Sequence, residues 1–234
     1  MKYLLILFLT LILTFNFFAQ KKVLIELFTS EGCSSCPQAD ELLTQLSNKN
    51  PQIYLLSFQV DYWDYLGWKD PYSSKQNSQR QYSYTKLFHL SSAYTPQAVI
   101  NGTCQVVGSN ASDVNNCISK SHELSSFLNS KHFSLTKTHG KIEIESLLPN
   151  ELFFSRYLEI VLIKKNAESQ VIRGENKGRR LVHKNVVIQL NSLKKNEKTI
   201  FDLPKNAQLN LFELIAILKN NKTHKVLDVL RISL

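Results

Sequence analysis

The sequence predicts an α/β domain followed by an antiparallel β domain, and three observations predict it. In the first half, short apolar runs alternate with helix-like segments, and one such junction holds Cys33 and Cys36. From Phe133 onward, apolar residues recur at every second position, as in half-buried strands. Hydrophobic residues make up 43% of the 234 residues and charged residues 20%, as in chains that bury a core. We therefore expect one domain over residues 20–130 and a second over 131–234.

The first 19 residues are typical of a signal peptide. Lys2 precedes an uncharged, mostly apolar run from Tyr3 to Phe18, and Ala19 is the small residue at the expected cut. Phe17 is bulkier than signal peptidase usually accepts, so an uncleaved membrane anchor is the alternative. Export would carry the four cysteines to a compartment where disulfides persist. We expect a periplasmic or secreted protein, anchored to a membrane only if this segment is retained.

The chain is basic, with 28 lysines and arginines against 19 aspartates and glutamates. Nucleic acid is the usual partner of such a charge. Here the lysines are scattered, and an exported protein rarely meets nucleic acid. We therefore interpret the charge as a solvated surface and expect no nucleic-acid partner.

The cysteine pair lies between the strand-like run Val23–Phe28 and the helix-like run Pro37–Leu46. A helix N-terminus directs backbone N–H groups and a positive dipole end at the first cysteine, which favours its thiolate. We expect Cys33 to face solvent and to attack, and Cys36 to resolve the mixed disulfide. The spacing predicts a redox-active disulfide and no other cofactor.

Two other uses of a C-x-x-C pair are half of a zinc site and an inert bridge. A second C-x-x-C is missing, since Cys104 and Cys117 are too far apart in sequence. No histidine or methionine is positioned to complete a copper site. The pattern therefore favours redox chemistry, and we expect no metal.

Further elements complete the first domain. A second apolar strand after the helix predicts a βαβ unit with parallel pairing. Asn101-Gly102 is a hairpin signal between two later strands, and Asn110 or Ser109 caps the last helix. The expected ranges are a strand over 53–60, helix within 74–90, strands over 97–100 and 103–107, and a helix over 111–128.

This order of elements is that of the thioredoxin fold. Pro96 falls where that fold carries a cis-proline opposite the cysteine pair. Most X-Pro bonds are trans, but this context favours the cis form. In such proteins the residue before the proline, here Thr95, offers backbone groups to a bound peptide. Thr95 and Pro96 are therefore expected in a substrate groove.

Four longer blocks carry a more specific resemblance. They are Glu26–Ser30 with Gly32–Pro37 and Ala39-Asp40, Val60–Pro71, Tyr94–Gln97 with Asn101-Gly102, and Arg173–Leu181 with His183 and Asn185–Val187. In these blocks the chain resembles a family of secreted bacterial thioredoxin-like proteins, described mainly as of unknown function. The resemblance implies a thioredoxin-like domain followed by a β-rich one, and a bacterial source. It implies no particular substrate.

Glu26 is the polar residue within the first apolar strand. Thioredoxins carry a buried carboxylate on the corresponding strand, which takes the proton of the second cysteine, although Glu26 lies one residue farther from the pair. Burial would raise the pKa of Glu26 and make it a workable base. The alternative is that its side chain points to solvent.

Aromatic residues gather just after the second strand, with Tyr62, Trp63 and Trp68 among them. At that position in the fold they would line a groove for a peptide or thiol ligand. The alternative is that each ring fills a satellite core.

Cys104 and Cys117 are expected to form a structural disulfide between the edge strand and the last helix of the first domain. In the second half, the basic segment Arg173–Lys184 is either a charged hairpin or a docking surface for a partner or for the cysteine site. Short alternating strands predict an antiparallel sandwich there. Their expected ranges are 141–145, 157–163, 186–190, 199–203, 209–218 and 226–232.

The sequence as a whole predicts an exported thiol–disulfide oxidoreductase. Its partners would be a protein thiol or disulfide and an upstream redox protein. The alternative is a non-catalytic thioredoxin-like binding module whose cysteine pair is a structural disulfide.

Overall fold

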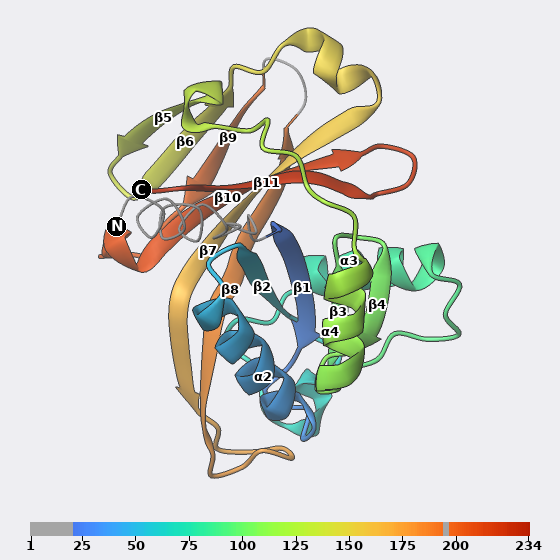
Figure 1. The fold of residues 1–234 in the computed structure, drawn as a ribbon. Helices are drawn as coiled ribbons and strands as arrows, with labels where there is room; N and C mark the ends of the chain where they lie inside the picture. Colours follow the sequence, from blue (N-terminus) through green and yellow to red (C-terminus); the bar gives the residue numbers. More distant parts are fainter. Residues whose placement is uncertain (1–20, 194–196) are drawn as a thin grey trace, which may run out of the picture.

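A computed structural model describes residues 21–193 and 197–234 (Figure 1). The expected signal peptide, residues 1–19, lies outside the described residues. Within those residues, no helix has the length and apolar character needed to cross a bilayer.

One mixed eight-stranded sheet runs through the molecule (Figure 1). The predicted parallel pair is present, with Val23 opposite Ile53 and Thr29 opposite Gln59. In sheet order the strands are β11 (Val226–Ile232), β10 (Phe212–Asn220), β7 (Arg156–Gln170), β8 (Arg180–Leu193), β2 (Ile53–Gln59), β1 (Val23–Thr29), β3 (Gln97–Ile100) and β4 (Cys104–Val107).

Helices cover both faces of the β1–β2 region, so both strands are buried throughout. Helix α2 (Cys36–Lys49) packs Ala39 and Leu43 on one face, together with the buried side of α4 (Ala111–Lys120). Helix α3 (Lys75–Leu87) packs Tyr84 on the other face. Strands enclosed in this way read as continuous apolar runs, which explains why they were visible in the sequence.

The last helix of the first half is shorter than expected, because α4 ends at Lys120 instead of 128. The segment that follows runs along β11, where Ser125 N donates to Leu227 O at 2.8 Å and Leu128 N donates to Asp228 Oδ2 at 2.7 Å. Leu124 and Leu128 are buried in two different cores. Burial of Leu124 and Leu128 against distant parts of the chain therefore holds this segment in an irregular conformation after α4 ends.

The turn between β3 and β4 is formed as predicted. Asn101 and Gly102 have φ values of 49° and 69°, in the left-handed region. A Cβ on Gly102 would lie 2.6 Å from the carbonyl oxygen of His224, so this position requires glycine. The predicted disulfide between Cys104 and Cys117 is also present and joins β4 to α4.

A second sheet, antiparallel and three-stranded, consists of β5 (Phe133–Thr138), β6 (Lys141–Ser146) and β9 (Lys198–Asp202) in the order β5-β6-β9. Ile142, Ile144 and Phe201 pack from this sheet against apolar residues of β7 and β10. Short 3-10 helices complete the fold at Asp64–Leu66, Ser130–His132, Asn150–Phe154 and Leu209–Leu211.

Strands β7 and β8 are much longer than the sequence predicted, and they connect the two halves. Toward β2, β8 makes one parallel pairing, Ser57 with Val186. The β7–β8 hairpin then continues past that point and ends in a loop over residues 171–179. Figure 1 shows this loop beside the segment that leads into α2.

Candidate functional site

The cysteine pair lies in the turn between the end of β1 and the start of α2, and Cys33 and Cys36 are joined by a disulfide. Cys36 N donates to Cys33 O at 3.2 Å, and Cys33 N donates to Ser30 O at 3.1 Å. Pro37 occupies the first turn of α2, where its missing N–H has no consequence. The pair is therefore fixed at a helix N-terminus, as the sequence predicted.

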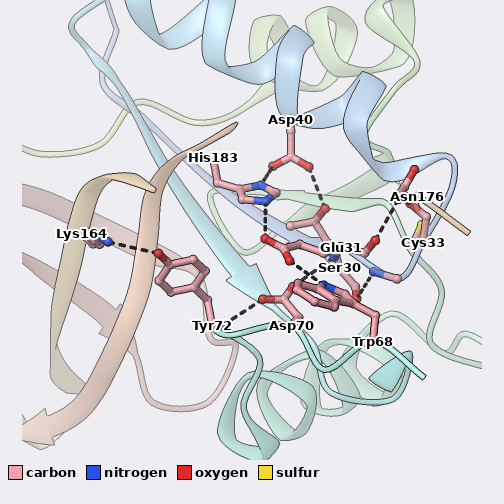
Figure 2. Close-up of polar contacts among 12 residues, drawn as sticks. Ser30, Glu31, Cys33, Asp40, Trp68, Asp70, Tyr72, Lys164, Asn176 and His183 are labelled. Carbon is pink, nitrogen blue, oxygen red and sulfur yellow. Dashed lines mark hydrogen bonds and ion pairs between the residues drawn. The ribbon is translucent and has the colours of Figure 1, made fainter. Parts of the chain in front are cut away.

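The prediction that Cys33 faces solvent is wrong. Cys33 is 2% exposed and Cys36 is fully buried. The cause is the loop at the tip of the β7–β8 hairpin. The buried Asn176 donates from Nδ2 to both Glu31 O and Cys33 O at 2.9 Å (Figure 2). Glu175 accepts from Ser34 N at 2.9 Å, so the loop is bonded to the backbone on both sides of Cys33.

The Thr95–Pro96 peptide bond is cis, in the form that the sequence favoured. Trp63 Nε1 donates to Thr95 Oγ1 at 2.8 Å. A Cβ on Gly32 would lie 2.9 Å from Trp63 Cβ, so Trp63 packs directly on the cysteine turn. Trp63 thus connects the cysteine turn to the Thr95–Pro96 segment.

The other two predicted aromatic residues lie apart from each other. Trp68 Nε1 donates to Glu31 Oε2 at 2.7 Å, beside the cysteine turn. Tyr62 instead contacts α3, where its hydroxyl donates to Gln81 Oε1 at 3.0 Å. Burial raises the pKa of Tyr62 to about 12. The site therefore includes the two tryptophans, and Tyr62 extends toward α3.

A buried histidine bridges two carboxylates next to the disulfide (Figure 2). His183 of β8 lies with Nδ1 3.2 Å from Asp40 Oδ1 and Nε2 3.2 Å from Glu31 Oε1. Asp40 is one turn after Cys36 on the buried side of α2, and it also accepts from Thr29 Oγ1 at 2.9 Å. Glu31 lies two residues before Cys33.

The charges of this group follow from its contacts. Burial alone would lower the pKa of His183, but the charge of Asp40 and hydrogen bonds with Asp40 and Glu31 raise it to about 10. Burial would raise the pKa of Glu31, yet hydrogen bonds from His183 and Trp68 lower it. The group is therefore an imidazolium between two carboxylates at neutral pH.

Asp70 adds a third carboxyl group. It accepts from Glu31 N at 3.0 Å and from Tyr72 N at 2.9 Å. Burial and the neighbouring charge of Glu31 raise the pKa of Asp70 to about 7. Asp70 thus titrates near neutrality, two residues from Trp68. Figure 2 shows Asp70 below Glu31.

The structure corrects the expectation for Glu26. Its side chain is fully buried on the face opposite α2, where it accepts from Arg80 Nε at 2.5 Å and from Tyr84 Oη at 2.6 Å. Burial would raise its pKa, but the charges of Arg80 and Lys219 lower it. Both predictions, a raised pKa and exposure to solvent, are wrong. Alternation along β1 decides this, because Ile25 and Leu27 face α2.

The buried ion cluster around Glu26 is completed by Glu159. Arg80 donates to both oxygens of Glu159, at 2.8 and 2.9 Å. Lys219 Nζ lies 3.7 Å from Glu26 and 3.8 Å from Glu159. This cluster connects α3 to β1, β7 and β10.

Sequence reasoning missed Glu31, Asp40, Asn176 and His183 as site residues. Asp40 and His183 are polar residues in segments otherwise read as a helix and a charged loop. A signal was present, because Asp40, Asn176 and His183 belong to the blocks that carry the family resemblance. Nothing in the sequence indicated that these blocks meet in space. Within the described ranges, no group of three or more His, Cys, Asp or Glu side chains is arranged to hold a metal ion.

Residues 24–219 match the family model described as "Protein of unknown function (DUF1223)". The chain belongs to this family. A crystal structure of an Agrobacterium tumefaciens protein superposes with a TM-score of 0.64 at 23% identity, over 91% of this chain and 94% of that one. HBP35 of Porphyromonas gingivalis superposes with a TM-score of 0.58 at 16% identity, over 92% and 75% of the two chains. These likenesses show a shared fold. No curated protein matches the sequence significantly.

Proposed function

We propose that this member of the DUF1223 family is an exported thiol–disulfide oxidoreductase that exchanges its Cys33–Cys36 disulfide with thiols of partner proteins. The observation that carries the proposal is the Cys33–Cys36 disulfide at the start of α2. A disulfide at a helix N-terminus has a leaving thiolate that the helix dipole stabilises. This favours exchange over an inert bridge.

The architecture supports the same proposal at a finer level. The succession β1-α2-β2, then β3-β4 and α4, follows the element order of a thioredoxin-like domain. In the second half, the β5–β6–β9 sheet packs on β7 and β10, as the layers of a sandwich do. We propose a thioredoxin-like unit over residues 20–130 and a β-rich unit over 131–234, joined through β8.

The exchange step begins with the oxidised pair. A partner thiolate attacks Cys33 Sγ, the Cys33–Cys36 bond breaks, and Cys36 leaves as a thiolate. A second thiolate of the partner then attacks the partner sulfur of the mixed disulfide and releases Cys33. The partner dithiol loses two electrons and becomes a disulfide, and this protein gains them. The reverse sequence reduces a partner disulfide, with Cys33 attacking and Cys36 resolving.

Asp40 takes the role once expected of Glu26. Residues four apart on a helix lie on one face with Cβ atoms roughly 5–6 Å apart, so Asp40 is beside Cys36. His183 Nδ1 lies 3.2 Å from Asp40 Oδ1 and orients this carboxyl group. In this proposal Asp40 accepts the proton of Cys36 when that thiol attacks, and His183 positions Asp40.

The test is the equilibrium of the Cys33–Cys36 pair against glutathione buffers. An exchanger gives a potential between about −270 and −120 mV, the range of known oxidoreductases. Alkylation after acid quenching, with mass analysis, separates this pair from Cys104–Cys117. A potential below about −300 mV, typical of structural disulfides, would contradict the proposal.

One observation favours a second function, a thioredoxin-like binding module with a structural disulfide. It is the burial of Cys33 beneath the 171–179 loop. A binding module would retain its affinity for its partner in the Cys33→Ser variant. An exchanger would lose its thiol–disulfide exchange activity in that variant and would form no mixed disulfide at position 33.

The proposed partners are a substrate protein thiol or disulfide and an upstream redox protein. The proposed location is the bacterial periplasm or the exterior, with membrane contact only through residues 1–19 if they are retained. The N-terminal residue of the purified mature protein, read by mass spectrometry, tests the cleavage after Ala19.

A further inference from the structure

The loop that covers the disulfide is itself well ordered by backbone contacts. We call residues 171–179 the cover loop. Val171 N donates to Arg179 O at 3.0 Å, and Gly178 N donates to Val171 O at 2.8 Å. Gly174 and Gly178, with φ values of 75° and 84°, allow the sharp turns. Hydrogen bonds within the cover loop therefore define its conformation over Cys33.

Three hydrogen bonds to backbone groups of the cysteine turn connect it to the cover loop. Asn176 donates to Glu31 O and Cys33 O. Arg179 Nη1 donates to Asn176 Oδ1 at 3.0 Å and orients this amide. Glu175 accepts from Ser34 N, and this contact lies at the protein surface. An incoming molecule therefore reaches the bond between Ser34 N and Glu175 first.

The charge of the cover loop is strongly one-sided. Glu175 is its single acidic residue, and its carboxylate contacts Ser34 N. Arg173, Lys177 and Arg179 are exposed. Arg180 pairs with Glu168 at 2.5 Å and is therefore compensated. Ser34 N thus holds a carboxylate near a helix start, in a loop that carries three exposed cations, and this combination would also favour the carboxylate of another molecule.

We propose that the cover loop is the docking surface for an acidic segment of the partner protein, whose carboxylate replaces Glu175 on Ser34 N and thereby frees Cys33. Arg173 and Lys177 attract the segment, and displacement of Glu175 loosens the adjacent Asn176 from Cys33 O. The exchange then follows the steps given above. This inference rests on the proposed function and adds to it the chemistry of the partner.

Charge complementarity at the rim of an interface acts mainly on the association rate and is screened by salt. The probes are therefore two synthetic peptides, each with one cysteine, that differ only in four flanking residues, aspartate in one and lysine in the other. Their rates of reaction with the oxidised full chain are followed by mass spectrometry. We expect the acidic peptide to react at least about tenfold faster at low salt, with the difference largely lost near 1 M NaCl.

A variant and a matched control locate the effect. Arg173→Ser with Lys177→Ser leaves Arg179 on Asn176 and is expected to remove most of the preference for the acidic peptide. Lys131→Ser with Lys222→Ser makes the same change of net charge at exposed positions outside the cover loop and is expected to retain it. Dithiothreitol, which is uncharged, is expected to reduce both variants at the wild-type rate, which also reports correct folding of the site.

Glu175→Gln gives a second, independent readout. Loss of the charged acceptor weakens the bond to Ser34 N, so reduction by dithiothreitol is expected to become about threefold faster. Equal rates for the two peptides, or a preference that survives in the Arg173, Lys177 variant, would overturn the inference and leave the proposed function standing. Failure of every thiol, dithiothreitol included, to reduce Cys33–Cys36 in the folded protein would instead overturn the proposed function.

Discussion

Two buried charge clusters lie on opposite sides of β1, and they differ in balance. In the arginine cluster, Arg80 and Lys219 face the carboxylates of Glu26 and Glu159. In the histidine cluster, a single imidazolium, that of His183, serves Glu31 and Asp40. Asp70 lies against the same Glu31.

The difference in charge balance indicates a structural role for the arginine cluster and a chemical role for the histidine cluster. The charges of Arg80 and Lys219 hold the pKa values of Glu26 and Glu159 low, that of Glu159 at about 2, so both carboxylates stay ionised across the physiological range. Burial lowers the pKa of Lys219. Such a network fixes α3 against the sheet. The histidine cluster has more carboxyl groups than cations, and its Asp70 titrates at about 7. An incompletely compensated group beside a disulfide is typical of a functional site.

The largest effect is expected in the arginine cluster. Arg80→Met leaves Glu26 and Glu159 buried with Lys219 alone, and we expect a loss of about 3–5 kcal/mol in the free energy of unfolding. Urea denaturation measures it. The control is Arg180→Met, which breaks an exposed pair with Glu168 and should cost at most about 1 kcal/mol. Equal costs at both positions would refute the distinction between buried and exposed pairs here.

His183→Gln is expected to follow, with a loss of roughly 3 kcal/mol that depends on pH. The pKa of His183 is raised to about 10 from an ordinary value of 6.5. Its stabilising contribution is therefore complete below pH 6.5 and disappears as the pH rises through 10. Denaturation at pH 6, 8 and 10 should show the gap between wild type and variant closing. A gap that is constant with pH would contradict a charged His183.

Asp70→Asn tests a second group whose contribution to stability falls as the pH rises. Because the pKa of Asp70 is raised from 3.8 to about 7, the folded protein binds an extra proton between these values, and the stability it contributes falls as the pH rises. Relative to wild type, the variant should gain roughly 3–4 kcal/mol between pH 4 and pH 8. The same difference in stability at both pH values would mean that Asp70 titrates normally.

The smallest expected effect is on a reaction rate, and it distinguishes the histidine cluster from the arginine cluster. Asp40→Asn should slow resolution of a Cys33 mixed disulfide by Cys36 about tenfold, because the carboxylate beside Cys36 is lost. Glu26→Gln, on the far face of the sheet, should leave that rate unchanged. Stopped-flow release of a thiol from the mixed disulfide measures both. A slow Glu26→Gln variant with a normal Asp40→Asn variant would restore Glu26 as the base.

Much of the fold was predictable because its signals are local. The β1, β2 and β6 ranges differ from the expected ones by at most one residue, and the Asn101-Gly102 turn and the Cys104–Cys117 bond are confirmed. The exceptions depend on distant contacts. Helix α4 stopped early because Leu124 and Leu128 pack on another part of the chain, and no local pattern encodes that contact.

The candidate site was predicted only in part, for a related reason. Cys33, Cys36 and Pro96 are visible as a motif and an element order. The burial of Cys33 and the contacts of Asp40 depend on a hairpin far away in the sequence, and both of its strands are more than twice as long as their apolar runs suggested. Polar residues such as Lys184 and Gln189 continue β8 because β7 pairs with them, not because of their propensity.

The hairpin also imposes an order of events in time. Asn176 lies 143 residues after Cys33, and β8 meets β2 at the single pairing of Ser57 with Val186. Because a chain is synthesised from its N-terminus, both cysteines are present and accessible before the cover loop has been made. We therefore expect the Cys33–Cys36 disulfide to form before the cover loop buries it.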